Sequence, residues 1–163
     1  RTLTVSFNTI SFFPMHLPEN IPFSFVNIPY YYNSTDSTVN FTFDLGLYSL
    51  TGSSLSIRNS ISVNKSFTSG ANQRGYVSMS AISVVQNITP GAWWWGIRIS
   101  SDSRSALSLL AGLSMNAGNA FPGSFIGGRM TDSSAALPNS IATSDLDTTG
   151  NDAMQVPYIL LTT

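Results

Sequence analysis

The sequence predicts an all-β protein: an antiparallel β-sandwich, jelly-roll-like, with about eight strands and little or no helix. Charged residues make up 9% of the 163 residues, against roughly 25% in an average soluble domain. Lys and Glu, which normally fill exposed helix positions, occur once each, as Lys65 and Glu19. The polar residues are mainly Ser, Thr and Asn, which favour strands, turns and loops. Short stretches of alternating apolar and polar residues recur along the chain, as half-buried strands require.

The N-terminal part begins with alternation at Leu3, Val5 and Phe7, which predicts a strand. Residues 12–32 then hold four prolines among aromatic residues. Because Pro has no backbone N–H to donate to a neighbouring strand, we expect this stretch to be an extended segment wrapped around the core, and not a central strand.

The clearest strand begins at residue 39. Five apolar residues at every second position form one of its faces: Val39, Phe41, Phe43, Leu45 and Leu47. The turn-forming residues 51–54 separate it from a second strand. The apolar residues of that second strand fall into two pairs, Leu55 with Ile57 and Ile61 with Val63.

The remaining elements are shorter. Residues 68–75 predict a loop and residues 76–88 a strand. Residues 106–119 alternate like a strand, although Leu110 also permits a short helix. Residues 137–146 predict a loop with a short strand or a single turn, and an apolar strand at 158–161 closes the chain.

Three consecutive tryptophans occupy residues 93–95. If this segment is a strand, Trp93 and Trp95 face the core and Trp94 shares the opposite face with Arg98, because successive side chains alternate. A subunit contact or the core is favoured over an exposed platform for a sugar, and we expect Trp94 to be covered by a second copy of the chain. Under a second copy, Trp94→Ala would weaken assembly more than the fold of one chain.

The residues that could contact a ligand or a neighbouring subunit are aromatic residues and an arginine, which are enriched at protein interfaces. They are Trp94, Arg98, Tyr30, Tyr31 and Tyr32. Large apolar residues on both faces of some strands, such as Leu109 and Leu110 or Val84 and Val85, also predict a homo-oligomer.

Catalytic chemistry finds little support. The chain has no cysteine, and its single histidine, His16, has no nucleophile or carboxylate partner indicated by the sequence. Asp145, Asp147 and Asp152 are weak calcium candidates, because they lack the full pattern of a calcium loop. We therefore expect no enzyme activity, no cofactor and no bound metal.

Other classes of partner are also disfavoured. The net charge is −1 without a basic run, which argues against a nucleic-acid partner. No apolar run approaches the roughly 20 residues of a membrane span. Four Asn-x-Ser/Thr sequons, at Asn33, Asn40, Asn64 and Asn87, are expected by chance in a chain so rich in Asn, Ser and Thr.

Four segments together resemble β-sandwich domains at the C-termini of bacteriophage tail fibres and related virion proteins. They are FDLGLYSLTGSSLSIRNS at 43–60, ITPGAWWWGIRIS at 88–100, ALPNSIATSDL at 136–146 and VPYILLTT at 156–163. The resemblance spans residues 39–163 and rests on structural motifs. The chain departs from the family pattern at Trp93 and Trp94, where a Tyr-Trp pair is more usual.

The resemblance implies that residues 1–163 are a single domain, the C-terminal part of a longer virion protein. It implies a homotrimer on the virion surface, assembled in the host cytoplasm, that attaches to a host cell-surface glycan or protein. A capsid decoration or other structural virion protein without a ligand is the alternative, and a polysaccharide depolymerase is less favoured.

Overall fold

The structure is a computed structural model that describes residues 2–4, 9–17, 24–34, 38–68, 70–80, 91–101, 107–110, 128–131, 136–147 and 158–162. Its strands are β1 (Thr2–Thr4), β2 (Thr9–Leu17), β3 (Phe25–Ser34), β4 (Val39–Thr51), β5 (Ser54–Phe67), β6 (Gly70–Ser80), β7 (Gly91–Ser101), β8 (Leu107–Leu110), β9 (Gly128–Thr131), β10 (Ser140–Ala142) and β11 (Leu160–Thr162). Within these ranges the helical content is one 3-10 turn, η2 (Thr143–Asp145).

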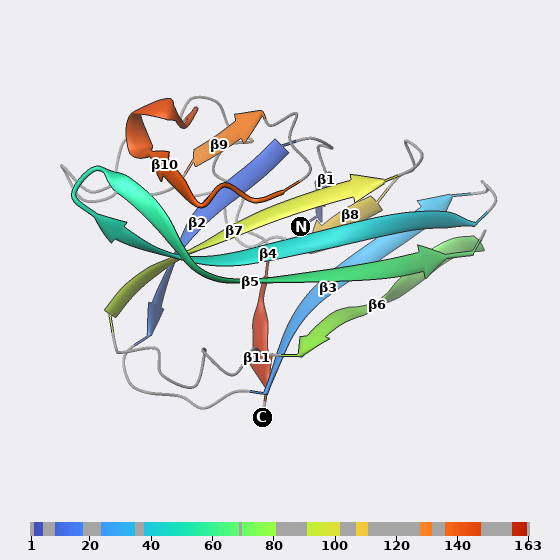
Figure 1. Cartoon of the computed structure of the whole chain (residues 1–163). Coiled ribbons are helices and arrows are strands. Elements are labelled where there is room, and N and C mark those ends of the chain that lie inside the picture. The colour runs from blue at the N-terminus through green and yellow to red at the C-terminus, as the bar shows by residue number, and fades with distance from the viewer. Residues whose placement is uncertain are drawn as a thin grey trace.

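The strands form a five-stranded and a six-stranded antiparallel sheet, packed as two layers (Figure 1). Eight strands carry the order β1-β8-β3-β6 in one layer and β2-β7-β4-β5 in the other. Each consecutive pair of these eight strands lies in different sheets, except the hairpin β4–β5. This is the order of a jelly roll built from two Greek keys, so the predicted fold class is confirmed.

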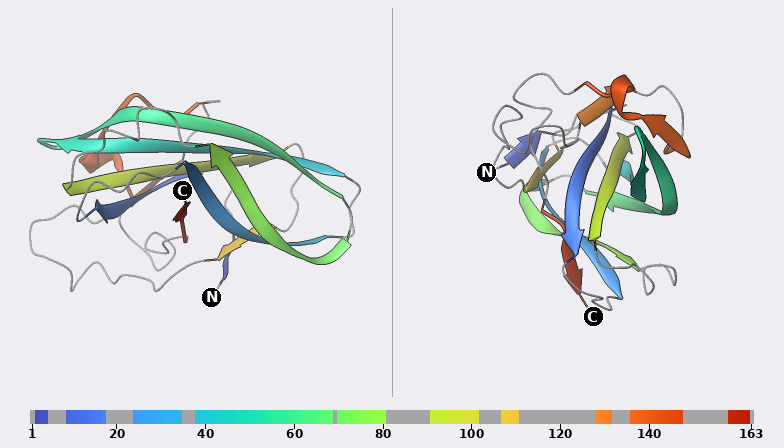
Figure 2. Two further views of the ribbon diagram at one scale, coloured as in Figure 1. Left: turned by 90° about the horizontal axis from the view of Figure 1, so that it is seen from below. Right: turned by 90° about the vertical axis from the view of Figure 1, so that its left-hand side faces the viewer.

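The other three strands are short additions. β9 and β10 extend the six-stranded sheet at its two edges, and β11 pairs with β3 in the five-stranded sheet. In the two further views of Figure 2, the two sheets lie face to face.

The inner core fills the space between the two sheets. Its buried residues come from alternate positions of β3, β4, β6 and β7 together with Phe13 and Phe67: Phe13, Val26, Ile28, Tyr30, Tyr32, Val39, Phe41, Phe43, Leu45, Leu47, Phe67, Val77, Met79, Trp95, Ile97 and Ile99. Aromatic rings meet edge to face at its centre; the Phe41 and Phe67 ring centroids, for example, are 5.3 Å apart at 83°. The faces of β4 and β7 that the alternation predicted to be buried are therefore the faces that form the inner core.

Residues 12–32 contribute to two strands, and the expectation that they hold no central strand is wrong. β3 lies between β6 on one side and β8 and β11 on the other. β8 pairs with Tyr30–Tyr32 and β11 with Phe25–Asn27, so Pro29 falls in the gap between them. Pro14 likewise lies beyond the stretch of β2 that pairs with β9. Both prolines sit where one edge of the strand has no partner among the described strands, which is where a missing N–H is tolerated.

The predicted loop at 68–75 is mostly strand. β6 begins at Gly70 and pairs with β3 as far as Ser34, with a register irregularity between Tyr32 and Ser34. Pairing along the whole of β3 overrides the local preference of Gly, Asn and Gln for a turn. No helix in the described ranges has the length and apolar character needed to cross a membrane.

Candidate functional site on the outer face of the six-stranded sheet

A second apolar cluster, the outer core, lies on the face of the six-stranded sheet that points away from the inner core. It consists of Ile10, Phe12, Tyr48, Leu55, Trp94, Ile141 and Leu146. Leu50, Ile57, Met130 and Leu137 pack against it at partial exposure. Because Ile141 and Leu146 belong to residues 136–147, that segment covers one half of this face.

The outer core needs two glycines beneath it. Gly46 of β4 and Gly96 of β7 are directly opposite each other in the sheet. A Cβ on either would lie 2.7 Å from Cε2 of Tyr48, and one on Gly96 would lie 2.9 Å from Cε1 of Phe12. The paired glycines therefore let the Tyr48 and Phe12 rings lie directly on the sheet, where they meet edge to face with centroids 5.1 Å apart.

Tyr48 also ties the covering segment to the sheet. Its hydroxyl donates a hydrogen bond of 2.9 Å to the backbone carbonyl of Pro138. The side chain is fully buried, and burial raises the pKa of the Tyr48 hydroxyl well above its ordinary value because the charged phenolate would lose its hydration. Tyr48 thus acts as a neutral donor at all ordinary pH values.

Trp94 belongs to this outer core. The side chain is 7% exposed in the single chain, and Trp95, on the opposite face of β7, belongs to the inner core. The alternation predicted for the three tryptophans is confirmed. Trp94 needs no second copy of the chain to cover it, because it is already buried in the single chain in a cluster with Ile141 and Leu146. Its burial gives no support to a subunit contact or a sugar platform there.

The tyrosine candidates divide in the same way. Tyr30 and Tyr32 are buried in the inner core, which removes them as surface platforms. Tyr31 is half-buried on the other face of β3, where its hydroxyl donates to Asn72 at 2.6 Å and the Arg74 guanidinium lies 5.5 Å from its ring centroid. It is the member of the three that a ligand could still reach.

A β-bulge at Arg58 divides β5 between the two cores. Tyr48 is opposite Ile57 and Leu47 is opposite Asn59, so Arg58 is the extra residue. Before the bulge Leu55 and Ile57 face the outer core, and after it Ile61 and Val63 face the inner core.

An open cavity of about 610 Å³, here called the hollow, lies beside this bulge. β10 pairs with β5 along Ser54–Ser56, and one further backbone hydrogen bond joins Ile57 N–H to the Asn139 carbonyl at 2.9 Å. The pairing with β5 does not extend to residues 136–138. The hollow opens at that point. It is lined by Asp44, Ile57, Arg58, Asn59, Ser60, Ile61, Ser62, Ala136, Leu137 and Asn139.

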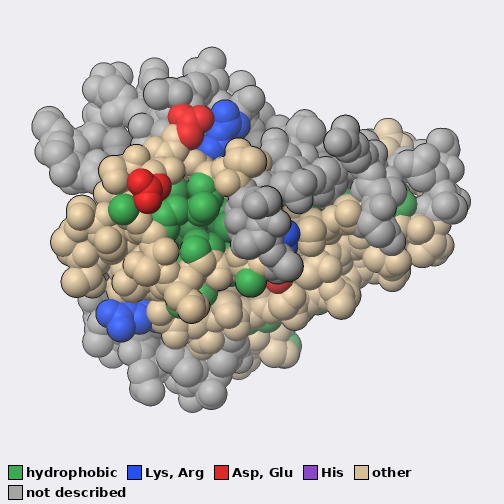
Figure 3. All heavy atoms as spheres, turned by 45° about the horizontal axis from the view of Figure 1, so that its top comes forward, with side chains coloured by type: hydrophobic (Ala, Val, Ile, Leu, Met, Phe, Trp, Pro, Cys, Tyr) green, Lys and Arg blue, Asp and Glu red, His purple; other side chains and the backbone are tan. Residues whose placement is uncertain are grey.

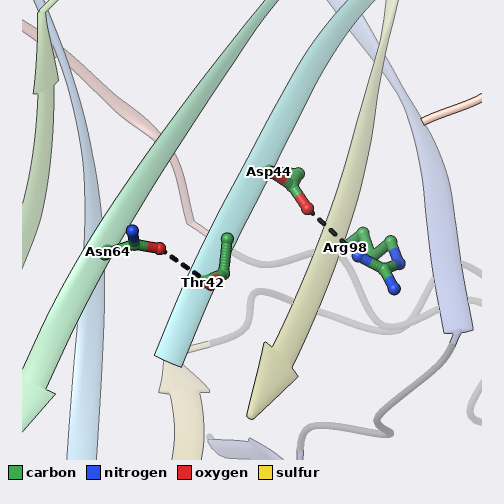
Figure 4. Close-up of polar contacts among 4 residues, drawn as sticks. All are labelled: Thr42, Asp44, Asn64 and Arg98. Carbon is green, nitrogen blue, oxygen red and sulfur yellow. Dashed lines mark hydrogen bonds and ion pairs between the residues drawn. The ribbon is translucent and has the colours of Figure 1, made fainter. Parts of the chain in front are cut away.

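The floor of the hollow joins a line of polar side chains on the same face. Arg98 of β7 reaches Asp44 of β4 in an ion pair of 3.2 Å, with side chains 8% and 14% exposed (Figure 4). One step along β4, Thr42 donates to Asn64 of β5 at 2.8 Å. The Asp44 carboxylate is therefore held in place by a cation, and its charge is balanced.

This side of the molecule carries few charges. In Figure 3 hydrophobic side chains gather mainly in a central patch, and a few Lys, Arg, Asp and Glu side chains are scattered over a largely neutral described surface.

Asn59 is among the residues that line the hollow, but it is opposite Leu47 and so is on the inner-core face of β5. Its Oδ1 accepts from the Ser60 backbone N–H at 2.8 Å, and its buried Nδ2 has no hydrogen-bond partner in the described part of the chain.

The acidic residues proposed for calcium do not come together in the described ranges. Asp147 pairs with Arg129 at 3.6 Å, Asp145 lies in η2 with an exposed side chain, and Asp152 lies outside the described residues. Among described residues, no group of three His, Cys, Asp or Glu side chains is placed to bind a metal. His16 lies in β2, but its side chain is not described.

The remaining sequence candidates lie on other parts of the surface. Asn33, Asn40 and Asn64 of the four sequons are exposed, and Asn87 is outside the described residues. Val84 and Val85 are also outside them, and the side chains of β8 are not described.

The sequence reasoning missed the residues of the hollow. Arg58 and Asn59 carry no motif, and Leu55, Ile57, Ile61 and Val63 keep the same period-2 spacing. The polar Asn59 in that apolar series is the one sequence signal of the bulge. It also missed Tyr76, which at 55% exposure is among the most exposed large side chains.

The chain matches no protein-family model, no curated protein and no solved structure.

The position of Trp94 leads to a stability prediction. Because Trp94 and Trp95 are buried in the outer and inner cores, Trp94→Ala and Trp95→Ala should each lower the free energy of unfolding of one chain by about 3–5 kcal/mol. Trp93→Ala, at a half-buried position on the same strand, is the matched control and should cost less. Chemical denaturation of the three variants measures this. An unchanged unfolding midpoint for Trp94→Ala would contradict the outer core.

The buried hydroxyl of Tyr48 gives a pH-dependent prediction. At pH 7, Tyr48→Phe should lower stability by about 1 kcal/mol through loss of the bond to Pro138. The pKa of Tyr48 is raised in the folded state, so its stabilising effect is complete below the ordinary pKa of 10.0 and is lost as pH rises above it. The wild type should then lose about 1.4 kcal/mol per pH unit relative to the variant, which removes its advantage near pH 11. Parallel stability curves from pH 7 to 11 would refute this.

Proposed function

We propose that the chain is a virion-surface domain of the tail-fibre kind that attaches to a host cell by binding a surface glycan, and that it acts as a homotrimer. The resemblance of residues 39–163 to such domains supports the setting. The jelly-roll fold is compatible with it, although the same fold serves many functions.

The hollow is the observation on which the binding function rests. Its volume of about 610 Å³ falls within the roughly 300–1,000 Å³ of small-molecule sites. Its lining mixes hydroxyl, amide and carboxylate groups with the apolar side chains of Ile57 and Leu137. A sugar has the same dual character, because its hydroxyls form hydrogen bonds and its C–H faces pack on apolar surface.

Binding without hydrolysis is the better-supported reading. Hydrolysis of a glycosidic bond normally uses two carboxyl groups on opposite sides of the bond. Among the described residues that line the hollow, Asp44 is the one acidic residue, and its carboxylate is already in an ion pair with Arg98. A depolymerase is therefore not proposed.

A structural virion protein is the alternative, and the outer face of the five-stranded sheet favours it. Phe25, Tyr76 and Leu160 are exposed there, and Arg74 is the one charged residue in β3, β6 and β11. A face with large apolar side chains and little charge suits contact between subunits. Antibody labelling of virions that carry the chain separates the two readings: label on fibres supports attachment, and label only on the capsid shell contradicts it.

Blocking the hollow should abolish attachment. Ser60 lines it and is exposed, so Ser60→Trp should fill the opening and change stability by no more than about 0.5 kcal/mol. Ser66→Trp is the control: it lies on the same face of β5, about 20 Å further along, and does not line the hollow. The readout is binding of the purified domain to host cells and to a glycan array. Full binding by Ser60→Trp would exclude the hollow as the site.

Self-association should depend on the other sheet. Tyr76→Ser removes an exposed aromatic side chain opposite Pro29, so it should shift the chain from trimer toward monomer without unfolding it. Light scattering at micromolar concentration measures the change, and Ser62→Ala on the six-stranded sheet is the control. A wild-type chain that is monodisperse and monomeric under these conditions would refute self-association.

A further inference from the structure

We propose that the hollow selects saccharides that carry a carboxylate, such as uronic or sialic acids, and that Arg58 is the residue that binds the carboxylate. This inference rests on the proposed glycan-binding function of the same site and adds the chemical class of its ligand.

The bulge places a cation at the edge of the hollow. Arg58 is the extra residue between the Tyr48–Ile57 and Leu47–Asn59 pairs, and its side chain is exposed and lines the hollow. Its Nε donates to the Ser49 hydroxyl at 2.7 Å. That bond orients the guanidinium and leaves the four N–H donors of its two terminal nitrogens for a ligand.

The charges around the hollow leave Arg58 unbalanced. Asp44 is neutralised by Arg98 at 3.2 Å. The two ion pairs found within the described ranges are Arg98–Asp44 and Arg129–Asp147, and neither includes Arg58. The described lining therefore has one uncompensated positive charge, which a ligand with one negative group would complement.

A carboxylate fits the geometry of this cation. The planar guanidinium donates two parallel hydrogen bonds to a carboxylate, and such charge-assisted bonds are stronger than neutral ones. Ser60 and Asn139 supply a hydroxyl and an amide group for the hydroxyls of the same sugar ring.

The test compares matched neutral and acidic sugars on the full chain by calorimetry. The pairs are lactose with sialyllactose and galactotriose with trigalacturonic acid. We expect the wild type to bind the acidic member at least about tenfold more tightly, because the contact with the carboxylate is charge-assisted. Arg58→Gln should remove that preference and keep the affinity for the neutral sugar. Arg58→Lys should retain part of it, because a point charge replaces the planar fork.

Arg74→Gln is the control, because it removes the same charge from the outer face of the other sheet, and it should change neither affinity. Equal binding of both sugars by the wild type, with both lost in Ser60→Trp, would overturn the acidic preference and leave the glycan function standing. Loss of both sugars in Arg58→Gln would assign Arg58 a structural role and overturn the inference. Binding of neither sugar, with host-cell binding unaffected by Ser60→Trp, would refute the proposed site itself. Equally tight binding of sulfated galactose would show a general anion site and overturn the carboxylate preference.

Discussion

The contact of the Tyr48 and Phe12 rings with the glycine pair Gly46 and Gly96 is the constraint on which the outer half of this protein depends. A side chain at either glycine would push the rings off the sheet. With the rings in place, the Tyr48 hydroxyl reaches the carbonyl of Pro138, and residues 136–147 can close over Trp94. Three segments that are far apart in the sequence meet at this contact: residues 46–48, the tryptophan strand and residues 137–141. Their common role here is to hold a cover on one sheet.

The bulge at Arg58 connects this cover with the candidate site. A regular strand would keep Leu55, Ile57, Asn59 and Ile61 on one face. One extra residue lets β5 serve the outer core with its first half and the inner core with its second half. The bulge lies where the segment that precedes β10 separates from β5. The hollow is the space between that segment and β5. The proposed site thus arises from the bulge that lets β5 pack against both cores.

The sequence predicted the layers well and the surface poorly. Strict alternation at Val39–Leu47 and Trp93–Ile99 indicates that one face of each strand is buried. That pattern was enough to predict the inner core and the jelly-roll class. The prolines at 14 and 29 led to the wrong prediction that residues 12–32 hold no central strand. A strand tolerates a proline where no neighbouring strand pairs with it at that position, and this depends on the order of strands in the whole sheet. Trp94 misled for a similar reason: alternation tells that it faces outward, but the cover comes from residues more than 40 positions away. The hollow forms where β5 and residues 136–138, which are far apart in the sequence, separate from each other. No local sequence pattern predicts such a separation.

The cover over Trp94 also has a temporal consequence. Chains are synthesised from the N-terminus, and domains begin to fold as they emerge. β2, β4 and β7 are complete at residue 101, whereas the cover begins at residue 136. A nascent or truncated chain therefore presents Phe12, Tyr48 and Trp94 to solvent as a bare apolar stripe. Premature termination before residues 137–141 would yield an aggregation-prone product rather than a smaller stable domain. The final sixth of the chain therefore completes the burial of the outer core.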